Sequence, residues 1–317
     1  MFYISAASTI SHQPTFKNAG FSNAIEELEK GSALLNPDFK EYIDSGLLRR
    51  MSKILRMSVA CAKDCLRQAG IEQPDSIVVG TGLGCLLDTE KFLNNFLTIE
   101  GLLPPTAFIQ STHNTIAGQI SLGLGNHGYN MTHTQNTLSF EHALQDAILL
   151  LGEDNEHVLV GAADEYIEIL DEIGTAFKLA PVTLTSGSSF FVLSGRRSET
   201  SMAKIADVET IGGVRDVSSQ IDVFLKRNRL DRGMIDQVFF ADNLISSMPS
   251  ILKKSFPGHV EYLNYPLYSG LYATNSAFGL HFAIDKMQLN RGIRNVLICN
   301  HLINNNLGLT LVQSLEA

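Results

Sequence analysis

The sequence has few cysteines, and their spacing excludes the common cysteine-based sites. No Cys-x-x-Cys pair and no ligand set with a nearby histidine occurs, so we expect no bound metal and a reduced, cytoplasmic setting. The chain also lacks a long hydrophobic run: residues 1–5 do not begin a signal peptide, and no window reaches the length of a transmembrane helix. The four cysteines are Cys61, Cys65, Cys85 and Cys299.

The sequence has fewer positively charged residues than negatively charged ones. The 317 residues carry 24 lysines and arginines against 33 aspartates and glutamates, which gives a net charge of -9. Neither a nucleic acid nor an anionic membrane would attract such a protein, so neither is expected as a partner. The densest basic cluster of the N-terminal half is either a solvated helix face or a patch for an acidic partner. It consists of Arg49, Arg50, Lys53 and Arg56.

Strand-like and helical patterns alternate along a chain that is 44% hydrophobic. This alternation predicts a layered α/β fold of two similar halves, residues 1–195 and 196–317, divided by a polar turn. The expected strands are residues 2–8, 76–80, 157–165, 184–194, 203–211, 237–241, 260–263, 295–300 and 307–313. The expected helices are residues 21–29, 51–68, 88–97, 218–227, 249–256 and 274–288.

Three alternate glycines follow the expected strand at residues 76–80. The spacing Gly80-x-Gly82-x-Gly84 differs from the G-x-G-x-x-G of dinucleotide-binding turns, and the region about twenty residues later holds only Glu100 as an acid. We therefore interpret the glycines as positions where backbones pack closely at a strand-to-helix turn.

Residues 130–147 are the stretch around which the chain is organised. A glycine-rich segment precedes them and apolar residues recur at helical spacing after Phe140, so we expect a polar turn that opens a helix. A helix N-terminus has unpaired N–H groups and a partial positive charge, which suits nucleophiles and oxyanions. The stretch resembles the nucleophile elbow of β-ketoacyl synthases, the condensing enzymes of fatty-acid and polyketide assembly, in which a cysteine stands at this turn.

The resemblance leaves two registers open at the position of the cysteine. Laying Ala143 and Ala147 on the alanines that follow it in the family places Thr137 there. A shift of two residues places Gln135 there, and glutamine often replaces the cysteine in chain-length factors, the non-condensing partners in type II polyketide synthases. Neither residue is a thiol. The hydroxyl of Thr137 has no recognisable base beside it in the sequence, and a helix cap is its plainer role.

The resemblance covers nearly the whole chain and implies the thiolase fold, with a layered αβαβα architecture. In the family, a thiolate accepts the acyl chain, and two histidines promote decarboxylation of the malonyl carrier and stabilise the resulting charge. In this sequence Asp242 and Leu271 stand at the two histidines, and Asn304 lies in the segment that matches the family's glycine-rich gating turn. The resemblance therefore predicts the scaffold of a synthase without its catalytic set.

Other residues near these positions are candidates for the site. His133 and His142 are each either a substitute base or a hydrogen-bonded structural residue. Candidates for the pocket or acyl tunnel are His133, Asn136, Phe140, Tyr268, Tyr272 and Asn304. The family segment that leads to the dimer interface matches here and gives the interface candidates Thr112, His113, Asn114 and Ala117.

Three functions follow from the resemblance. The first is a non-condensing, chain-length-factor-like subunit, similar to those of aryl-polyene and type II polyketide systems, that pairs with an active β-ketoacyl synthase and shapes its acyl tunnel. The second is an active synthase or acyltransferase with an unorthodox nucleophile, and the third is a binding module for acyl carrier protein. The implied partners are a synthase subunit or a second copy of this chain, together with acyl carrier protein. Apart from the carrier's phosphopantetheine, no cofactor is expected.

Overall fold

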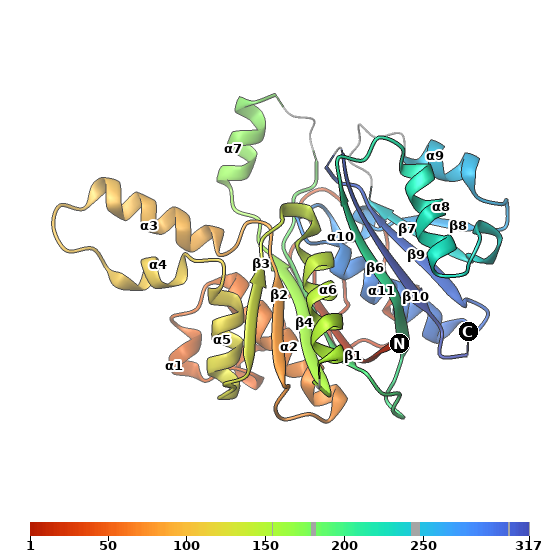
Figure 1. Ribbon diagram of the computed structural model, residues 1–317. Helices are drawn as coiled ribbons and strands as arrows, with labels where there is room; N and C mark the ends of the chain where they lie inside the picture. Colours follow the sequence, from red (N-terminus) through yellow and green to blue (C-terminus); the bar gives the residue numbers. More distant parts are fainter. Residues whose placement is uncertain (154, 179–181, 242–247, 304, 317) are drawn as a thin grey trace.

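The structure is a computed structural model that describes residues 1–153, 155–178, 182–241, 248–303 and 305–316. Strands in these ranges form one mixed sheet in the order β3-β2-β4-β5-β1-β6-β10-β9-β7-β8 (Figure 1). Their bounds are β1 (Phe2–Ile10), β2 (Ser76–Gly80), β3 (Tyr129–His133), β4 (His157–Asp164), β5 (Gly187–Ser194), β6 (Ala203–Gly212), β7 (Gln237–Ala241), β8 (Glu261–Asn264), β9 (Asn295–Asn300) and β10 (Asn306–Gln313).

The sheet repeats one topology twice. From the edge inwards, the first half runs β3-β2-β4-β5-β1 and the second runs β8-β7-β9-β10-β6. In each half the three outer strands are parallel and the two inner pairings are antiparallel. The halves join where β1 pairs with β6, with Ile4 opposite Ala203. Two similar halves are therefore confirmed, whereas the boundary between them at residue 195, within one fused unit, stays a prediction.

The helices complete five layers. Helices α6 and α11 contact strands of both halves and enclose the central hydrophobic core. Helices α2 and α5 cover the outer face of the first half, and α8 and α9 cover the outer face of the second (Figure 1). The helices are α1 (Ser45–Leu48), α2 (Lys53–Ala69), α3 (Leu86–Thr98), α4 (Pro105–Gln110), α5 (Thr115–Leu124), α6 (Ser139–Gly152), α7 (Ile169–Ala176), α8 (Val217–Arg227), α9 (Met248–Ser255), α10 (Pro266–Ser269) and α11 (Ser276–Leu289).

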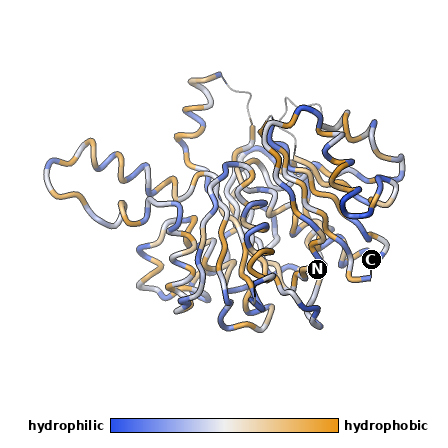
Figure 2. Tube along the Cα trace, in the orientation of Figure 1, coloured by the Kyte–Doolittle hydropathy of each residue, from blue (hydrophilic) through white to orange (hydrophobic). Residues whose placement is uncertain are grey.

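Alternation along the strands explains the layering. In β2, Ile77 and Val79 join the core beneath α2, whereas Val78 joins the central core beside α6. All three are fully buried, as expected for a strand that is covered on both faces. Figure 2 shows the hydrophobic residues concentrated along these strands. The αβαβα architecture predicted from the sequence is thus confirmed. None of the helices in the described ranges is long and apolar enough to cross a membrane.

Two predicted elements are wrong. Residues 21–29 contain only the 3-10 turn η1 (Phe21–Asn23), because distant groups capture the backbone that a helix would use. The Asp285 carboxylate accepts hydrogen bonds from the N–H groups of Gly20 and Ser22, and Leu28 N–H donates to the carbonyl of Leu267. Residues 130–133 are not part of a turn but of β3, which pairs in parallel with β2.

The glycines after β2 pack as predicted. A Cβ atom on Gly80 would lie 2.5 Å from the carbonyl oxygen of Ser139, at the start of α6. A Cβ atom on Gly82 would lie 2.2 Å from the Cβ atom of Ala273, in the second half. Both separations are far below van der Waals contact, so only glycine lets the end of β2 approach both segments.

We expect Gly80→Ala to lower the free energy of unfolding by roughly 1–3 kcal/mol, because the new methyl group must displace the start of α6. Chemical denaturation followed by circular dichroism measures this loss. Gly152→Ala is the matched control, since nothing lies within 4 Å of the added Cβ atom and no positive φ is involved. Equal stability of Gly80→Ala and the control would contradict the close approach.

Candidate functional site

The stretch that resembles a nucleophile elbow lies between β3 and α6. The 3-10 turn η3 (Asn136–Leu138) makes the bend, and Asn136 adopts a left-handed conformation with φ 54°. Thr137 follows and is buried. The second half holds this bend in place, because the side-chain amide of Asn300, at the end of β9, donates to the carbonyl of Thr137 at 2.7 Å and to Oε1 of Glu141 at 2.9 Å.

A cavity of about 340 Å³ opens beside the elbow, and most of its wall is apolar. Thr137 lines it, and Gln135 does not. The hydroxyl of Thr137 is buried and has no hydrogen-bond partner among the residues that the structure describes. The lining residues are Leu83, Asn136, Thr137, Asp164, Glu165, Leu170, Ile173, Gly174, Leu184, Thr185, Leu271, Tyr272, Ala273, Leu302 and Ile303.

Only one of the two positions that correspond to the family's histidines lies within the described residues. Leu271 lines the cavity, as its place in the sequence predicts, and it offers no proton. Asp242 and Asn304, the other predicted positions, lie outside the described residues. Within the described ranges, no histidine, lysine or arginine lines the cavity, so the Thr137 hydroxyl has no imidazole or amine to activate it.

The Asp164 carboxylate, at the end of β4, ties the cavity wall together. From the first half it accepts hydrogen bonds from the hydroxyl of Thr81 and the N–H groups of Gly82 and Leu83, at 2.9–3.2 Å. From the second half it accepts the N–H and the hydroxyl of Thr274, at 3.1 and 2.7 Å. Burial raises the pKa of Asp164, while these donors favour its carboxylate.

Glu165 lies next in the chain and anchors the start of α3, because its Oε1 accepts the N–H of Leu87 at 3.1 Å. Burial raises the pKa of Glu165 to about 7. Burial also raises the pKa of Glu141, at the start of α6, to about 7. Both side chains are only 2% exposed. Asp164 and Glu165 were not among the predicted site residues, although two acids at the end of a buried strand are a signal in the sequence.

Two of the predicted pocket residues, Asn136 and Tyr272, line the cavity, and three others lie elsewhere. His133 is held by Asp146 at 2.9 Å and stacks on His142, with ring centroids 6.4 Å apart. Phe140 is a core residue that packs on Phe191. Tyr268 lines a separate cavity of about 210 Å³ at the ends of β7 and β8. All three side chains are thus engaged with other residues and do not line the elbow cavity.

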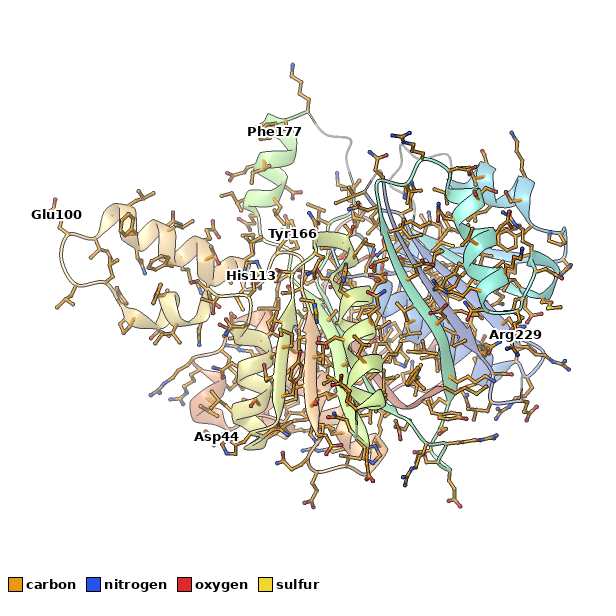
Figure 3. All side chains as sticks on the ribbon, viewed as in Figure 1. Asp44, Glu100, His113, Tyr166, Phe177 and Arg229 are labelled. Carbon is orange, nitrogen blue, oxygen red and sulfur yellow. The ribbon has the colours of Figure 1, made fainter. Side chains whose placement is uncertain are left out.

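The interface candidates divide in a similar way. Thr112, His113 and Asn114 are exposed where the chain enters α5. The prediction that Ala117 lies at an interface is wrong, because Ala117 is fully buried in this chain's own core beneath α2 and its side chain cannot reach a partner. Figure 3 shows His113 where the α3–α4 segment leaves the body.

Removing the Asp164 carboxylate is expected to lower the free energy of unfolding by at least about 3 kcal/mol, since Asp164→Ala leaves several buried donors without an acceptor. Urea denaturation measures the change. Asp222→Ala is the control, because Asp222 forms an exposed ion pair with Arg232 that contributes about 0–1 kcal/mol. A loss in Asp164→Ala no larger than in the control would contradict the role of Asp164 in holding the wall.

The raised pKa of Glu165 gives a pH-dependent prediction. Its folded pKa, about 7, lies above the unfolded value, so its contribution to stability is fully present below about pH 4.5 and is lost as the pH rises through 7. Compared with Glu165→Gln, the native chain should therefore lose up to about 3 kcal/mol between pH 4.5 and 7.5. Urea midpoints measured at several pH values test this. A difference between the two proteins that stays constant with pH would contradict the raised pKa.

The comparisons with known proteins point to one family. The family model described as "Beta-ketoacyl synthase, N-terminal domain" matches residues 37–207, more than half of the chain. No curated protein matches the chain in sequence. Five similar solved structures share only 12–15% identity with the chain, so they show the fold alone.

Three of these structures illustrate the likeness. The ishigamide ketosynthase/chain length factor is 15% identical, with a TM-score of 0.84 over 99% of both chains. A type II polyketide synthase acyl-carrier protein in complex with its ketosynthase gives 13% identity and a TM-score of 0.79 over 99% of both chains. A ketosynthase in complex with its chain length factor from Xenorhabdus doucetiae gives 14% and 0.61 over 98% of both chains. With the matching elbow, the repeated halves and the family model, these findings lead to one conclusion: the chain belongs to the β-ketoacyl synthase family.

Proposed function

We propose that this chain is a non-condensing, chain-length-factor-like subunit that pairs with an active β-ketoacyl synthase and helps to shape its acyl tunnel. The observation that carries the proposal is the largely apolar elbow cavity, which Thr137 and Leu271 both line. The resemblance assigns these two residues to the family's nucleophile and to one of its histidines. A condensing enzyme needs a thiolate and groups that stabilise developing charge. In this role the scaffold is retained, while a hydroxyl and hydrocarbon take the places of these groups, and no histidine, lysine or arginine lines the cavity within the described residues.

An apolar arm supports pairing with a second subunit. Helices α3 and α4 project from the body as a hairpin beside α5 and the edge strand β3 (Figure 1). The ring of Phe92 contacts the rings of Phe96 and Phe108, and six large hydrophobic side chains of the hairpin, these two rings included, are more than half exposed. Exposed apolar patches of this kind mark protein interfaces. The six are Leu93, Phe96, Leu97, Leu102, Phe108 and Ile109.

Two similar structures suggest the nature of the partners. One contains a ketosynthase with its chain length factor, and another contains a ketosynthase with its acyl-carrier protein. In this chain the exposed side chains of Arg49 and Arg50 lie just before α2 and provide a basic patch for an acidic carrier protein. The proposal places the complex in the cytoplasm, with a polyene or other polyketide chain as its product.

A second candidate is an active synthase or acyltransferase that uses Thr137. One observation favours it: Glu165 lines the same cavity, and a carboxyl with a pKa of about 7 is in the range of a general base. The two candidates differ in what Thr137→Ala does. Product formation by the complex with a synthase should be unchanged if the subunit is non-condensing. Loss of an acyl adduct and of product in this variant would support the second candidate instead.

The arm provides a test of pairing. We expect Leu97→Asp/Leu102→Asp to weaken association with the co-expressed synthase at least tenfold, because two carboxylates would have to be buried at the interface. Co-purification and analytical ultracentrifugation measure the association. Both side chains are highly exposed, so the fold of the single chain should not change. Val223→Asp, at an exposed apolar position on α8 across the molecule, is the matched control. Undiminished pairing of the double variant would contradict the assignment of the arm.

A further inference from the structure

The cavity of about 210 Å³ at the ends of β7 and β8 differs in chemistry from the elbow cavity. The two cavities share no lining residue. Three residues of the smaller cavity are aromatic and one is an acid, and no lysine, arginine or histidine lines it in the described part of the chain. Its aromatic and polar lining residues are Glu27, Phe240, Tyr262, Asn264 and Tyr268.

The acid of this cavity, Glu27, comes from the first half, in the segment that follows β1. Two contacts fix the segment to α10. The N–H group of Leu28 donates to the carbonyl of Leu267 at 2.7 Å, and the side-chain amide of Gln13 donates to the carbonyl of Tyr268 at 3.3 Å. Glu27 itself is exposed and forms no ion pair or hydrogen bond with a described residue. Its charge is therefore held beside the cavity and is not neutralised.

The charges around the cavity are mainly negative. Burial raises the pKa of Tyr268, and the carboxylates of Glu27 and Glu261 raise it further, so both acids act on this lining residue. Glu261 is already engaged, because its Oε1 lies 3.5 Å from Nζ of Lys286 and its Oε2 accepts from the side-chain amide of Gln237. Lys286 does not line the cavity. A cation is thus favoured in the cavity, and an anion is repelled.

The side chain of Asn264, the last residue of β8, provides a hydrogen-bond acceptor. Its Oδ1 atom is buried and has no hydrogen-bond partner among the described residues. Buried polar atoms normally have such a partner, so a ligand that brings an N–H group here gains a hydrogen bond at no cost to the protein. The hydroxyl of Tyr262 is not available in the same way, because it donates to the carbonyl of Leu252 at 3.3 Å.

We infer that this cavity binds the ammonium group of a primary alkylamine. Aromatic rings attract an ammonium ion, and the carboxylate of Glu27 supplies the opposite charge. An ammonium group carries three donors and no acceptor, which matches the unpartnered Oδ1 of Asn264. A quaternary ammonium ion would leave this oxygen without a donor. The inference does not rest on the proposed function, because neither the elbow nor a partner synthase takes part in it.

The size of the cavity limits the ligand. A volume of about 210 Å³ lies below the usual range of roughly 300–1,000 Å³ for sites that hold drug-sized molecules. Leu263 and Leu267 complete the wall and offer hydrocarbon to the methylene groups that carry the amine. The ligand is therefore a short amine or the end of a lysine side chain rather than a large cationic molecule.

The test is isothermal titration calorimetry of the purified full-length chain at pH 7.5, in phosphate buffer of low ionic strength, which contains no amine. Three probes carry the same butyl chain: butylammonium, butyltrimethylammonium and 1-butanol. We expect butylammonium to bind saturably, at least fivefold more tightly than butyltrimethylammonium and at least tenfold more tightly than butanol. Of the three, only butylammonium has both a positive charge and N–H donors.

Two variants and a matched control assign the binding to this cavity. Glu27→Gln removes the charge at an exposed position and should weaken butylammonium binding at least threefold. Glu26→Gln is the control, since Glu26 is the neighbouring exposed acid and does not line the cavity. Asn264→Leu keeps the approximate volume and removes the acceptor, so it should abolish the preference for butylammonium over the trimethylated probe.

Four results would overturn the inference. They are no saturable binding of butylammonium, binding of butanol or of butyltrimethylammonium as tight as that of butylammonium, an equal effect of Glu27→Gln and Glu26→Gln, and a preference that survives in Asn264→Leu. The assay uses the chain without a partner subunit, so its outcome is independent of pairing with a synthase.

A primary ammonium group is supplied either by a free amine or by a lysine of a partner protein. Mass spectrometry of acid extracts, after the amines are labelled with dansyl chloride, detects a free amine that is present with the native chain and absent with Glu27→Gln. Carbodiimide coupling, which joins a carboxylate directly to an amine, detects a lysine when peptide mapping shows Glu27 linked to a co-expressed synthase. The first result identifies a free amine as the ligand, and the second identifies the partner.

Discussion

The Asp164 carboxylate is the interaction on which the site depends. It stands at the end of β4 with no exposed surface, and it binds the turn after β2 in its own half and Thr274 at the entrance to α11 in the other. Asn300, at the end of β9, does the reverse, because it reaches from the second half to the elbow before α6. Each half thus holds the helix start of the other. A buried carboxylate is tolerated only when such donors replace its hydration, so the wall cannot relax without exposing it.

This framework holds the shape of the site without using any reactive group. The groups that fix the elbow are carboxylates, amides and backbone N–H groups at the strand ends, and none of them is a nucleophile. The hydroxyl of Thr137 and leucine side chains, among them Leu271, line the cavity. Most of the wall is apolar, and Asp164 directs both of its oxygens to donors of the protein itself. A subunit that shapes a chain needs such a cavity, whereas a condensing enzyme needs reactive groups in it.

The buried carboxyl group of Glu165, next to Asp164 in the chain, connects the cavity to the arm formed by α3 and α4. Glu165 lines the cavity and accepts the backbone N–H of Leu87, in the first turn of α3. Thr89 ties α3 back to the carbonyl of Ser111 at the end of α4. The base of the arm is therefore fixed to the cavity wall, although the apolar surface of the arm extends far from that wall (Figure 2). A partner that contacts the arm would thus be oriented by the strand ends that also form the site.

The sequence by itself determined the repeat and the strands other than β3. The strands at residues 76–80, 237–241 and 295–300 were predicted with the bounds that they have in the structure. Runs of β-branched and aromatic residues favour a strand through effects that extend over only a few residues of the chain. The resemblance placed either Thr137 or Gln135 at one site with Leu271. Only the tertiary structure decided that Asp164 and Glu165 join them, that His133 turns to Asp146, and that Ala117 points inwards. It also replaced a predicted helix at residues 21–29, where Asp285 captures the backbone from 263–265 residues away. Local patterns specify elements, but the partners that bury and hydrogen-bond a side chain come from distant parts of the chain and are set only when the layers pack.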